Sequence, residues 1–577
     1  MNMKLNRLIA LALFATAFAS CEKFLDQPPV DQFTNDNYWS SETNVEKFTN
    51  RFYDLFIGYG TEGNSVFYFP TLNDNQASGS FRDWNYKQVP ASVGTWNDCY
   101  TNIRRANLLI EKIPTISAMS DAAKNNWLGV ARLIRAWQHY ELVRSFGDVI
   151  WVDKVLDVTS DDKEAYLYGP RQDRDEVMDK VLEDLNFAVA NITMNASSRV
   201  LINAAVAQAI KSEICLYEGT FCKYRVAADG QKAPDVTRAN KFLTEAKAAA
   251  NAIMGNSMYQ LNKSYQANYN SIDLKDNKVN KEMILYKHYE MGVLSHSMIA
   301  YTSSSTKQNG LSKAAFDSYL FTDGKPLATT SMDKTDHPTL DPATGRLKLD
   351  AILAVRDSRL AASIDNVLMY DGNDFARFGV GMATTSSTGY GVSKFDNGTI
   401  ATNYRQNTQS NYTDAPVIWL AVIYLNYAEA CAELGACTQA DLDISINKLR
   451  DRAGMPHLTT TPEADPANNM GVSDLIWEIR RERRVELMFD NNDRYWSLIR
   501  WHQLDKLDTQ QYPDQLRGAY VKDDPKVTAK TDAEGYIVNT HDLVRIYDKK
   551  HYLVPIPSDQ ISLYEAAGKT LTQNPGW

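Results

Sequence analysis

Residues Ala205–Gly219 read AVAQAIKSEICLYEG, and residues Ala421–Gly435 read AVIYLNYAEACAELG, so two distant stretches share one pattern of small and apolar residues. Each ends in a glycine and precedes a second predicted helix with small or aliphatic residues at packing positions, such as Ala239, Ala246 and Ile446. Small residues where two antiparallel helices cross are typical of tetratricopeptide-like helix pairs. The pattern predicts a mainly α-helical fold built from such pairs, and it leaves an irregular helical bundle open as the alternative.

Further helices are predicted on the N-terminal side of these stretches. A capping box at Thr43–Glu46 predicts the start of a helix, because a Thr side chain and a Glu three residues later satisfy the first backbone N–H groups. An apolar stripe over residues 96–113 predicts a helix that Pro114 ends, and a following helix is predicted to end at Gly147. The helix of the first quoted stretch is predicted to end near Gly219.

Long segments without helical periodicity interrupt the helices. They are rich in Asn, Ser, Thr, Gly and Tyr, and they cover Leu72–Gly94, Lys263–Gly310 and Asp365–Pro416. Loops of this length in a compact domain usually carry function. We therefore expect the ligand-binding residues in these segments.

The N-terminus predicts a lipoprotein signal. Lys4 and Arg7 form a short basic region, and an apolar run follows over residues 8–18, which is shorter than the roughly 20 residues of a membrane span. Small residues then precede Cys21, as at a bacterial lipoprotein cleavage site. We expect residues 1–20 to be removed and Cys21 to carry a lipid anchor; an ordinary secretory signal with an incidental cysteine is the alternative.

The composition argues against several kinds of partner. The net charge of −10 disfavours nucleic acid and anionic lipid, which favour basic patches. The chain has 31 Tyr and 11 Trp, whose flat apolar faces and polar tips suit ring-containing polar ligands. One of the six cysteines is Cys21, and neither Cys-x-x-Cys nor His-Glu-x-x-His occurs. We therefore expect no metal site and no cofactor.

An ordered set of motifs carries a resemblance to a known family. It begins at Tyr38-Trp39 and continues with Trp96-x3-Tyr100-x2-Ile103-x2-Ala106-Asn107, Leu142-Val143-Arg144-Ser145-Phe146-Gly147-Asp148-Val149, Arg356-Asp357-Ser358-Arg359-Leu360, Tyr427-Ala428-Glu429-Ala430, Arg450-Asp451-Arg452-Ala453-Gly454-Met455-Pro456, Arg481-Glu482-Arg483-Arg484-Val485-Glu486-Leu487 and Gln573-Asn574-Pro575-Gly576-Trp577. Together they resemble the SusD/RagB family of outer-membrane nutrient-capture lipoproteins. The chain departs from the family pattern at Ile150, at Asp490-Asn491 and at Ser497.

The resemblance implies the fold and the partner. It implies four tetratricopeptide-like helix pairs with a loop-rich, partly irregular ligand-binding portion, and a SusC-type TonB-dependent barrel as partner in the outer membrane. Family members mostly hold oligosaccharides, and some hold peptides. We expect a signal peptide over 1–20, an N-terminal helical region with a binding loop over 21–260, and a C-terminal region with long loops and closing helices over 261–577.

The Arg/Glu-dense stretch from Glu478 to Arg484 invites a catalytic interpretation. Glu482 and Glu486 would form an acid/base pair, as in glycosidases. Both are predicted to lie in a regular helix between arginines, which favour the ionised carboxylate. We therefore expect a structural ion-pair network there and a protein that is not an enzyme.

The aromatic loops supply the candidate ligand-binding residues. A pyranose needs an aromatic platform for its C–H face and amide or charged groups for its hydroxyls. This chemistry selects Asp74, Asn75, Phe81, Arg82, Trp84, Tyr86, Tyr289, Tyr301 and Asn309. Alternatively, Trp84 and Tyr86 only pin their loop to the helices.

Three functions stay open on the sequence. The first is non-catalytic oligosaccharide capture at the cell surface for delivery to the barrel. The second is peptide capture, as in the RagB branch of the family. The third is a surface glycosidase that uses a loop carboxylate such as Asp74 or Asp83.

Overall fold

The computed structural model describes most of the chain. The described residues are 38–61, 63–78, 83–156, 167–193, 198–275, 280–303, 307–369, 385–522, 529–538 and 544–577. The predicted signal over residues 1–20 and the predicted lipidation site Cys21 lie outside them, as do the candidate binding residues Phe81 and Arg82.

The protein is mainly helical, as the sequence predicts. The longer helices are α5 (Gly94–Lys112), α6 (Asp121–Phe146), α8 (Arg174–Asn191), α9 (Ala204–Tyr224), α10 (Val236–Met254), α17 (Leu420–Glu433) and α20 (Asp474–Glu486). The shorter ones are α4 (Glu42–Thr49), α11 (Ala267–Asn270), α12 (Met298–Ser303), α13 (Lys313–Phe316), α14 (Asp350–Ala354), α15 (Ser358–Ala361), α16 (Thr402–Gln406), α18 (Gln439–Asp443), α19 (Ile446–Ala453), α21 (Asp493–Arg500) and α22 (Ser558–Ala566). Six short 3₁₀ turns add to them among the described residues, including η5 (Pro513–Gln515).

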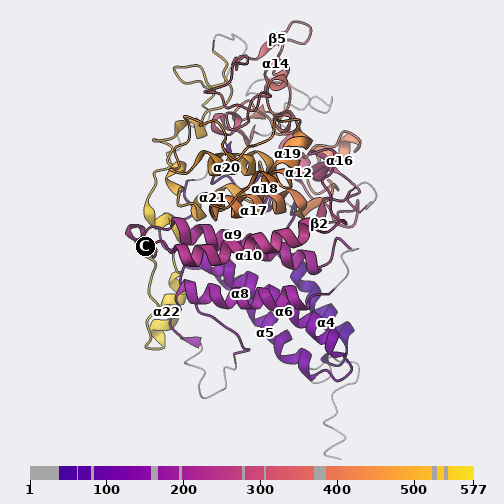
Figure 1. Ribbon diagram of the computed structural model, residues 1–577, viewed down its shortest axis with the longest axis vertical. Coiled ribbons are helices and arrows are strands. Elements are labelled where there is room, and N and C mark those ends of the chain that lie inside the picture. The colour runs from indigo at the N-terminus through magenta and orange to yellow at the C-terminus, as the bar shows by residue number, and fades with distance from the viewer. Residues whose placement is uncertain are drawn as a thin grey trace, which may run out of the picture.

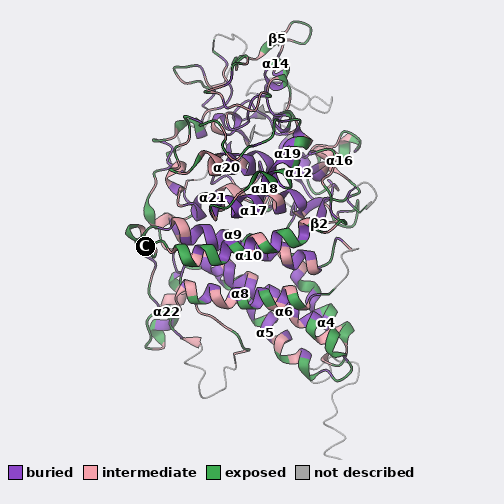
Figure 2. Cartoon of the chain, in the orientation of Figure 1, coloured by how far each residue is buried: buried purple, intermediate pink, exposed green. Residues whose placement is uncertain are grey.

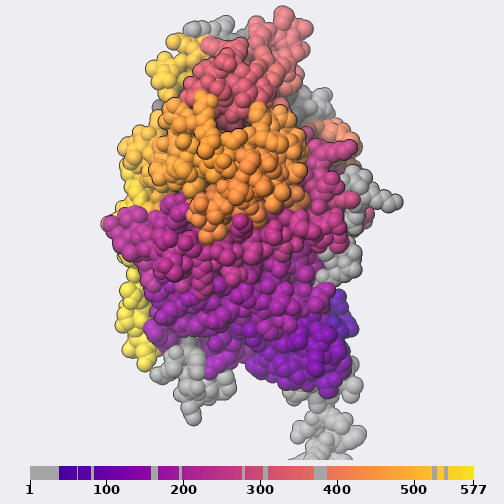
Figure 3. Space-filling model, viewed as in Figure 1, coloured from indigo at the N-terminus to yellow at the C-terminus, as the bar shows by residue number. Residues whose placement is uncertain are grey.

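The long helices stack in layers. In Figure 1, α5, α6 and α8 lie at one end of the stack, α10 and α9 lie side by side next to them, and α17 and α20 follow. Figure 3 shows the same order as bands of colour from indigo to orange, with the loop-rich part beyond them. Figure 2 shows exposed residues along the outer edges of α8 and α10, while α9 between its neighbours is largely buried. The stacked helices confirm the helix-pair architecture that the Ala-rich stretches predict.

The structure corrects two predicted helix boundaries. Helix α4 begins at Glu42 with Ser41 as its N-cap. The prediction that the helix begins with a capping box at Thr43–Glu46 is therefore wrong. Helix α9 continues through Gly219 to Tyr224, although the sequence predicts an end near that glycine. A Cβ at Gly219 would lie 2.7 Å from Cγ of Leu243 in α10. Gly219 therefore permits the close approach of α9 and α10 instead of ending the helix.

Other predicted boundaries are confirmed. Helix α5 ends at Lys112 and gives way to a 3₁₀ turn that contains Pro114. Helix α6 ends at Phe146, and Gly147 follows with a φ of 76°. Helix α17 ends just before Gly435, whose φ of 68° is a conformation that glycine adopts without strain.

The described strands are short and form four two-stranded sheets. They are β1 (Gln76–Ala77), β2 (Met283–Lys287), β3 (Lys307–Gln308), β4 (Gly310–Leu311), β5 (Thr339–Asp341), β6 (Arg346–Lys348), β7 (Thr385–Ser386) and β8 (Ala415–Trp419). The pairs β1–β4, β2–β8 and β5–β6 are antiparallel, and β3–β7 is parallel. In the longest pair Met283 lies opposite Trp419 and Lys287 opposite Ala415. These pairs brace the loops that lie against the helices.

Two large hydrophobic cores hold the molecule together. One lies among α5, α6, α8, α9 and α10 and includes residues of α21 and the C-terminal segment, and the other lies among α17, α20 and the loop-rich part. The second core also includes Tyr59, Phe67 and Tyr68, although they precede the first helices of the stack. In the part of the chain that the structure describes, no helix combines the length and apolar character that crossing a membrane requires.

Buried ion pairs fix the helices against one another. Glu429 of α17 accepts hydrogen bonds from Arg483 of α20 (2.9 Å), from Arg500 of α21 (2.9 Å) and from the indole of Trp501 (2.7 Å). Burial raises the pKa of Glu429, but Arg500 and Arg483 outweigh it and bring the pKa to about 2. One carboxylate thus connects three helices.

The C-terminal segment returns to the first helices. Figures 1 and 3 show it in yellow along one side of the helix stack, down to α22. The backbone N–H of Val554 donates to the carbonyl of Ser145 (2.7 Å), and the hydroxyl of Tyr564 donates to the carbonyl of Gly169 (2.9 Å). Arg171 donates to the carbonyl of Thr572 (2.9 Å).

Candidate ligand-binding pocket

A pocket of about 490 Å³ lies between α20, α21 and the loops beside them. Helix α20 begins at the N-cap Ser473, whose hydroxyl accepts from the N–H of Ile476 (3.3 Å). Residues at positions i, i+4 and i+7 share one face of a helix, and this spacing places Trp477, Arg481 and Arg484 on the pocket side. The other lining residues include Asp74, Ala314, Asp317, Asp465, Arg494, Lys506, Gln511, Tyr512 and Gln515.

Asp74 is held at the pocket wall by two arginines. Arg494 donates to both of its carboxylate oxygens, at 2.7 and 2.8 Å, and Arg484 lies 3.3 Å from one of them. Burial raises the pKa of Asp74, but Arg484 and Arg494 outweigh burial and hold the pKa well below its usual range. Asp74 is therefore ionised at neutral pH.

Two partly exposed aromatic side chains face the same pocket, each fixed by a polar contact. The indole N–H of Trp477 donates to Asp465 (3.1 Å), which also pairs with Arg481. Lys506 donates to the hydroxyl of Tyr512 (2.7 Å). The pocket thus combines aromatic faces with carboxylate, amide, guanidinium and ammonium groups, the mixture that binds polar rings.

The structure places only part of the predicted site at this pocket. Asp74 lines it, and Asn75 lies beside it, where its side-chain oxygen accepts from Arg484 (2.7 Å). Trp84 is only 9% exposed; its ring stacks on His551 at 4.0 Å, and its indole donates to the carbonyl of Ile546 (2.6 Å). These contacts agree with the alternative that Trp84 pins its loop.

The remaining predicted residues lie elsewhere. Tyr86 packs half-buried against the first core. Tyr289 is buried beside Tyr59, and its hydroxyl donates to the carbonyl of Gly60 (3.3 Å). Tyr301 contacts the ring of Phe69 edge-on, and the carbonyl of Asn309 accepts from the hydroxyl of Tyr68 (3.2 Å). A ligand role for these residues stays a prediction.

Sequence reasoning missed most of the residues that line the pocket. The Asn- and Tyr-rich segments, which supply the sequence candidates, do not contain the lining residues Trp477, Arg484, Arg494, Lys506 and Tyr512. The only local signal is the i, i+4, i+7 spacing along α20, and the same stretch also predicts ion pairs. The ion-pair prediction itself is confirmed for the glutamates: Arg450 donates to Glu482 (2.9 Å), and Arg359 donates to Glu486 (2.9 Å). Burial raises the pKa of both glutamates, but the arginines together have the larger effect, and both pKa values lie below the usual value of a glutamate.

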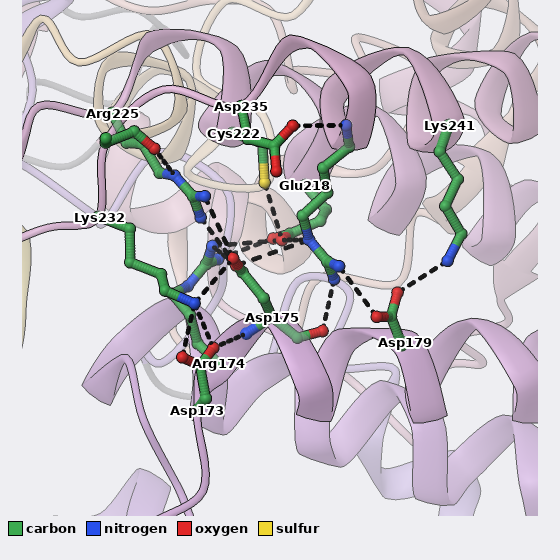
Figure 4. Close-up of polar contacts among 12 residues, drawn as sticks. Asp173, Arg174, Asp175, Asp179, Glu218, Cys222, Arg225, Lys232, Asp235 and Lys241 are labelled. Carbon is green, nitrogen blue, oxygen red and sulfur yellow. Dashed lines mark hydrogen bonds and ion pairs between the residues drawn. The ribbon is translucent and has the colours of Figure 1, made fainter.

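A second polar cluster lies between α8, α9 and α10 (Figure 4). The ligand atoms of Asp175, Glu218 and Cys222 lie within 4.8 Å of one another, a spacing that a metal ion requires. Cations already neutralise these carboxylates: Arg225 donates to Asp175 (2.7 Å), and Arg174 donates to Glu218 (2.7 Å). Burial, together with Glu218, raises the pKa of the Cys222 thiol, which disfavours the thiolate that binds metals. The cluster is an ion-pair network that joins three helices.

The stacked helices, the loop-rich part and the polar, aromatic pocket beside them define a class of mainly helical protein with a candidate ligand-binding site. The SusD family matches residues 250–577, more than half of the chain, and residues 23–216 match the family described as "Starch-binding associating with outer membrane". The chain belongs to the SusD family, and proteins of this family are non-catalytic binding proteins.

Individual relatives are more distant. A "SusD-like protein" of Bacteroides ovatus is 25% identical over 201 residues, which are 33% of this chain and 35% of that protein. "SusD-like protein P38" of Formosa agariphila is 26% identical over 227 residues, which are 37% of this chain and 42% of that protein. These matches therefore span well under half the length of the curated relatives.

Solved structures share the fold over nearly the whole chain. A SusD-like carbohydrate-binding protein of Bacteroides fragilis is 21% identical, with a TM-score of 0.67 over 91% of this chain and 99% of that one. Surface glycan-binding protein A of Bacteroides fluxus is 17% identical, with a TM-score of 0.59 over 93% of this chain and 100% of that one. At these identities the likeness establishes the SusD-like fold.

Proposed function

We propose that this protein is a cell-surface lipoprotein that binds oligosaccharides without cleaving them and delivers them to a SusC-type TonB-dependent transporter in the outer membrane. The observation that carries the proposal is the pocket of about 490 Å³, in which Trp477 and Tyr512 lie among polar and charged side chains. Membership of the SusD family supports it, because the family description over residues 23–216 names starch binding and the outer membrane.

The pocket chemistry suits capture. The rings of Trp477 and Tyr512 can cover the C–H face of a pyranose, while Gln511, Asp317 and the arginines can bond its hydroxyls. Affinities in the millimolar to micromolar range, about −4 to −8 kcal/mol, would let the ligand pass onward.

The same geometry disfavours a glycosidase. General acid catalysis requires a carboxyl group that is protonated near the working pH. The two arginines keep Asp74 ionised, and Glu482 and Glu486 are at most 3% exposed, with depressed pKa values. Asp83 forms an ion pair with Lys87 at 2.8 Å.

Calorimetry tests the binding step. The full chain, purified in detergent, is titrated with a panel of neutral and acidic oligosaccharides and with mixed peptides. We expect saccharide binding without release of shorter products. Trp477→Ala should weaken that binding by about 1–2 kcal/mol, judged by what aromatic contacts contribute. Trp39→Ala, which removes a half-buried indole beside α4, serves as the control and should leave the affinity unchanged.

The outcomes separate the alternatives. Peptide binding in place of saccharide binding would assign the protein to the peptide-capturing branch of the family. Product release from an oligosaccharide would overturn the non-catalytic role. The anchoring step is tested by Cys21→Ser, which should release the protein from the outer-membrane fraction, and the delivery step by copurification of the full chain with a SusC-type barrel from that fraction.

A further inference from the structure

One side of the pocket is lined by guanidinium groups, with no carboxylate among the described residues there. A recess of about 40 Å³ adjoins the main pocket, and the two share Arg481, Arg484 and Arg494. Its lining, among the residues that the structure describes, is Ser318, Met470, Trp477 and four arginines, with no carboxylate. A volume of this size holds a few water molecules or one carboxylate group.

Two of the four arginines have their own acidic partners. Arg481 pairs with Asp465 and Glu478, and it donates to the carbonyl of Ser318 (3.3 Å). Arg480 donates to Glu433 (3.0 Å). These two guanidinium groups are largely committed to the scaffold.

The other two arginines share one acidic partner. Arg494 donates to Asp74 through Nε and Nη2, and Arg484 uses Nε for Asn75 and Nη2 for the backbone and side chain of Asp74. Neither Nη1 atom makes a hydrogen bond to any described residue, and neither is a buried atom without a partner. Two guanidinium groups thus face one carboxylate, and each keeps a donor for a ligand.

The wider pocket does not supply the missing negative charge. Asp317 pairs with Lys313, and Asp514 lies 3.0 Å from Arg517. Asp465 is already the partner of Arg481.

Arg484 keeps its charge in the pocket. Burial and the neighbouring Arg494 lower the pKa of Arg484 to about 10, and Asp74 offsets only part of that effect. A pKa of about 10 leaves Arg484 fully charged at neutral pH.

We propose that the pocket is selective for acidic oligosaccharides, and that Arg484 and Arg494 bind the carboxylate or sulfate group of one sugar residue in the recess. Guanidinium groups present paired donors that match the oxygens of such anions. Trp477 lines both the recess and the main pocket, so it can cover the ring that carries the acidic group. This inference rests on the proposed glycan binding and names its ligand class.

The first experiment uses an array of neutral and acidic glycans with matched backbones, probed with the full chain in detergent. The tightest acidic glycan is then titrated by calorimetry beside its carboxyl-reduced or desulfated form, which identifies the acidic group. We expect the acidic form to bind at least about tenfold more tightly, the factor that corresponds to about 1.4 kcal/mol, and the difference to shrink as salt is added.

Substitutions test the two arginines through the ratio of the acidic to the neutral affinity. Arg494→Gln removes the excess positive charge, and it should lower this ratio by at least about tenfold. The double variant Asp74→Asn with Arg494→Gln also removes the carboxylate, so Arg484 again supplies an excess positive charge. We expect this variant to recover much of the preference for the acidic glycan over the neutral one. Arg104→Gln, which changes an exposed arginine of α5, is the control and should leave the ratio as in the wild type. Melting temperatures of all variants report whether each is folded.

Each outcome decides between the two proposals. Neutral glycans that bind as tightly as their acidic forms would overturn the acidic selectivity and leave oligosaccharide capture standing. An unchanged ratio in a folded Arg494→Gln variant would also overturn the assignment of the recess. Binding of no glycan at all would overturn the proposed function and this inference with it.

Discussion

Glu429→Gln probes the carboxylate that joins α17, α20 and α21. Glu429 is 1% exposed and accepts hydrogen bonds from Arg483, Arg500 and Trp501. Its arginine partners lower its pKa from 4.5 to about 2. At about 1.4 kcal/mol per pKa unit, this depression corresponds to about 3 kcal/mol of folding free energy. Removing one partner of a buried ion pair generally costs about 3–5 kcal/mol of folding free energy, which agrees with this value.

The sign of the pH dependence follows from the depressed pKa. The contribution of Glu429 is fully present above its unfolded pKa of 4.5 and is lost as the pH falls toward about 2. The difference in unfolding free energy between wild type and Glu429→Gln should therefore be about 3 kcal/mol at pH 7 and smaller at pH 3. Urea unfolding followed by tryptophan fluorescence measures it at both values.

A surface pair provides the matched control. Glu111 lies 2.8 Å from Lys112, but its side chain is 52% exposed, so Glu111→Gln should change stability by less than about 1 kcal/mol. If Glu429→Gln unfolds at the same urea concentration as the wild type at pH 7, or if its deficit is the same at pH 3, the assignment of Glu429 as a charged connector is refuted.

Three further substitutions test the packing. Gly219→Ala should destabilise the protein by about 1–3 kcal/mol because the new Cβ would lie 2.7 Å from Leu243. Gly94→Ala should instead stabilise it by up to about 1 kcal/mol, because its Cβ would only touch Asp98 at an ordinary contact distance of 3.8 Å. Thermal unfolding of the two variants side by side gives both signs. Trp84→Ala should cost about 3–5 kcal/mol because it removes a buried ring stacked on His551, and a variant with wild-type stability but weaker glycan binding would return Trp84 to the binding site.

The helical architecture could be predicted because its signals are local. Apolar periodicity, Pro114 and Gly147 mark helix faces and ends within a few residues, and the structure confirms them. Gly219 shows the limit of this reasoning. A glycine that ends a helix and a glycine that lets two helices touch look alike in sequence, and only the position of Leu243 on α10 distinguishes them.

The candidate site was harder to predict because it is assembled from distant segments. Asp74 was found through its loop composition, but its partners Arg484 and Arg494 lie more than 400 residues away and belong to helices. An arginine that supports the scaffold and an arginine that faces a ligand have the same local sequence signature. Their roles separate only when the free donors on each guanidinium are counted in three dimensions.

The return of the C-terminal segment to the first helices has a kinetic consequence. The contacts of Ser145 with Val554 and of Arg171 with Thr572 close loops of about 400 residues. The entropic cost of such closure grows only slowly with loop length, but long-range contacts of this kind slow folding. During synthesis the early helices emerge long before the residues that complete their packing. We therefore expect the final segment to dock late in folding, and chains truncated there to remain open and prone to aggregation at their N-terminal half.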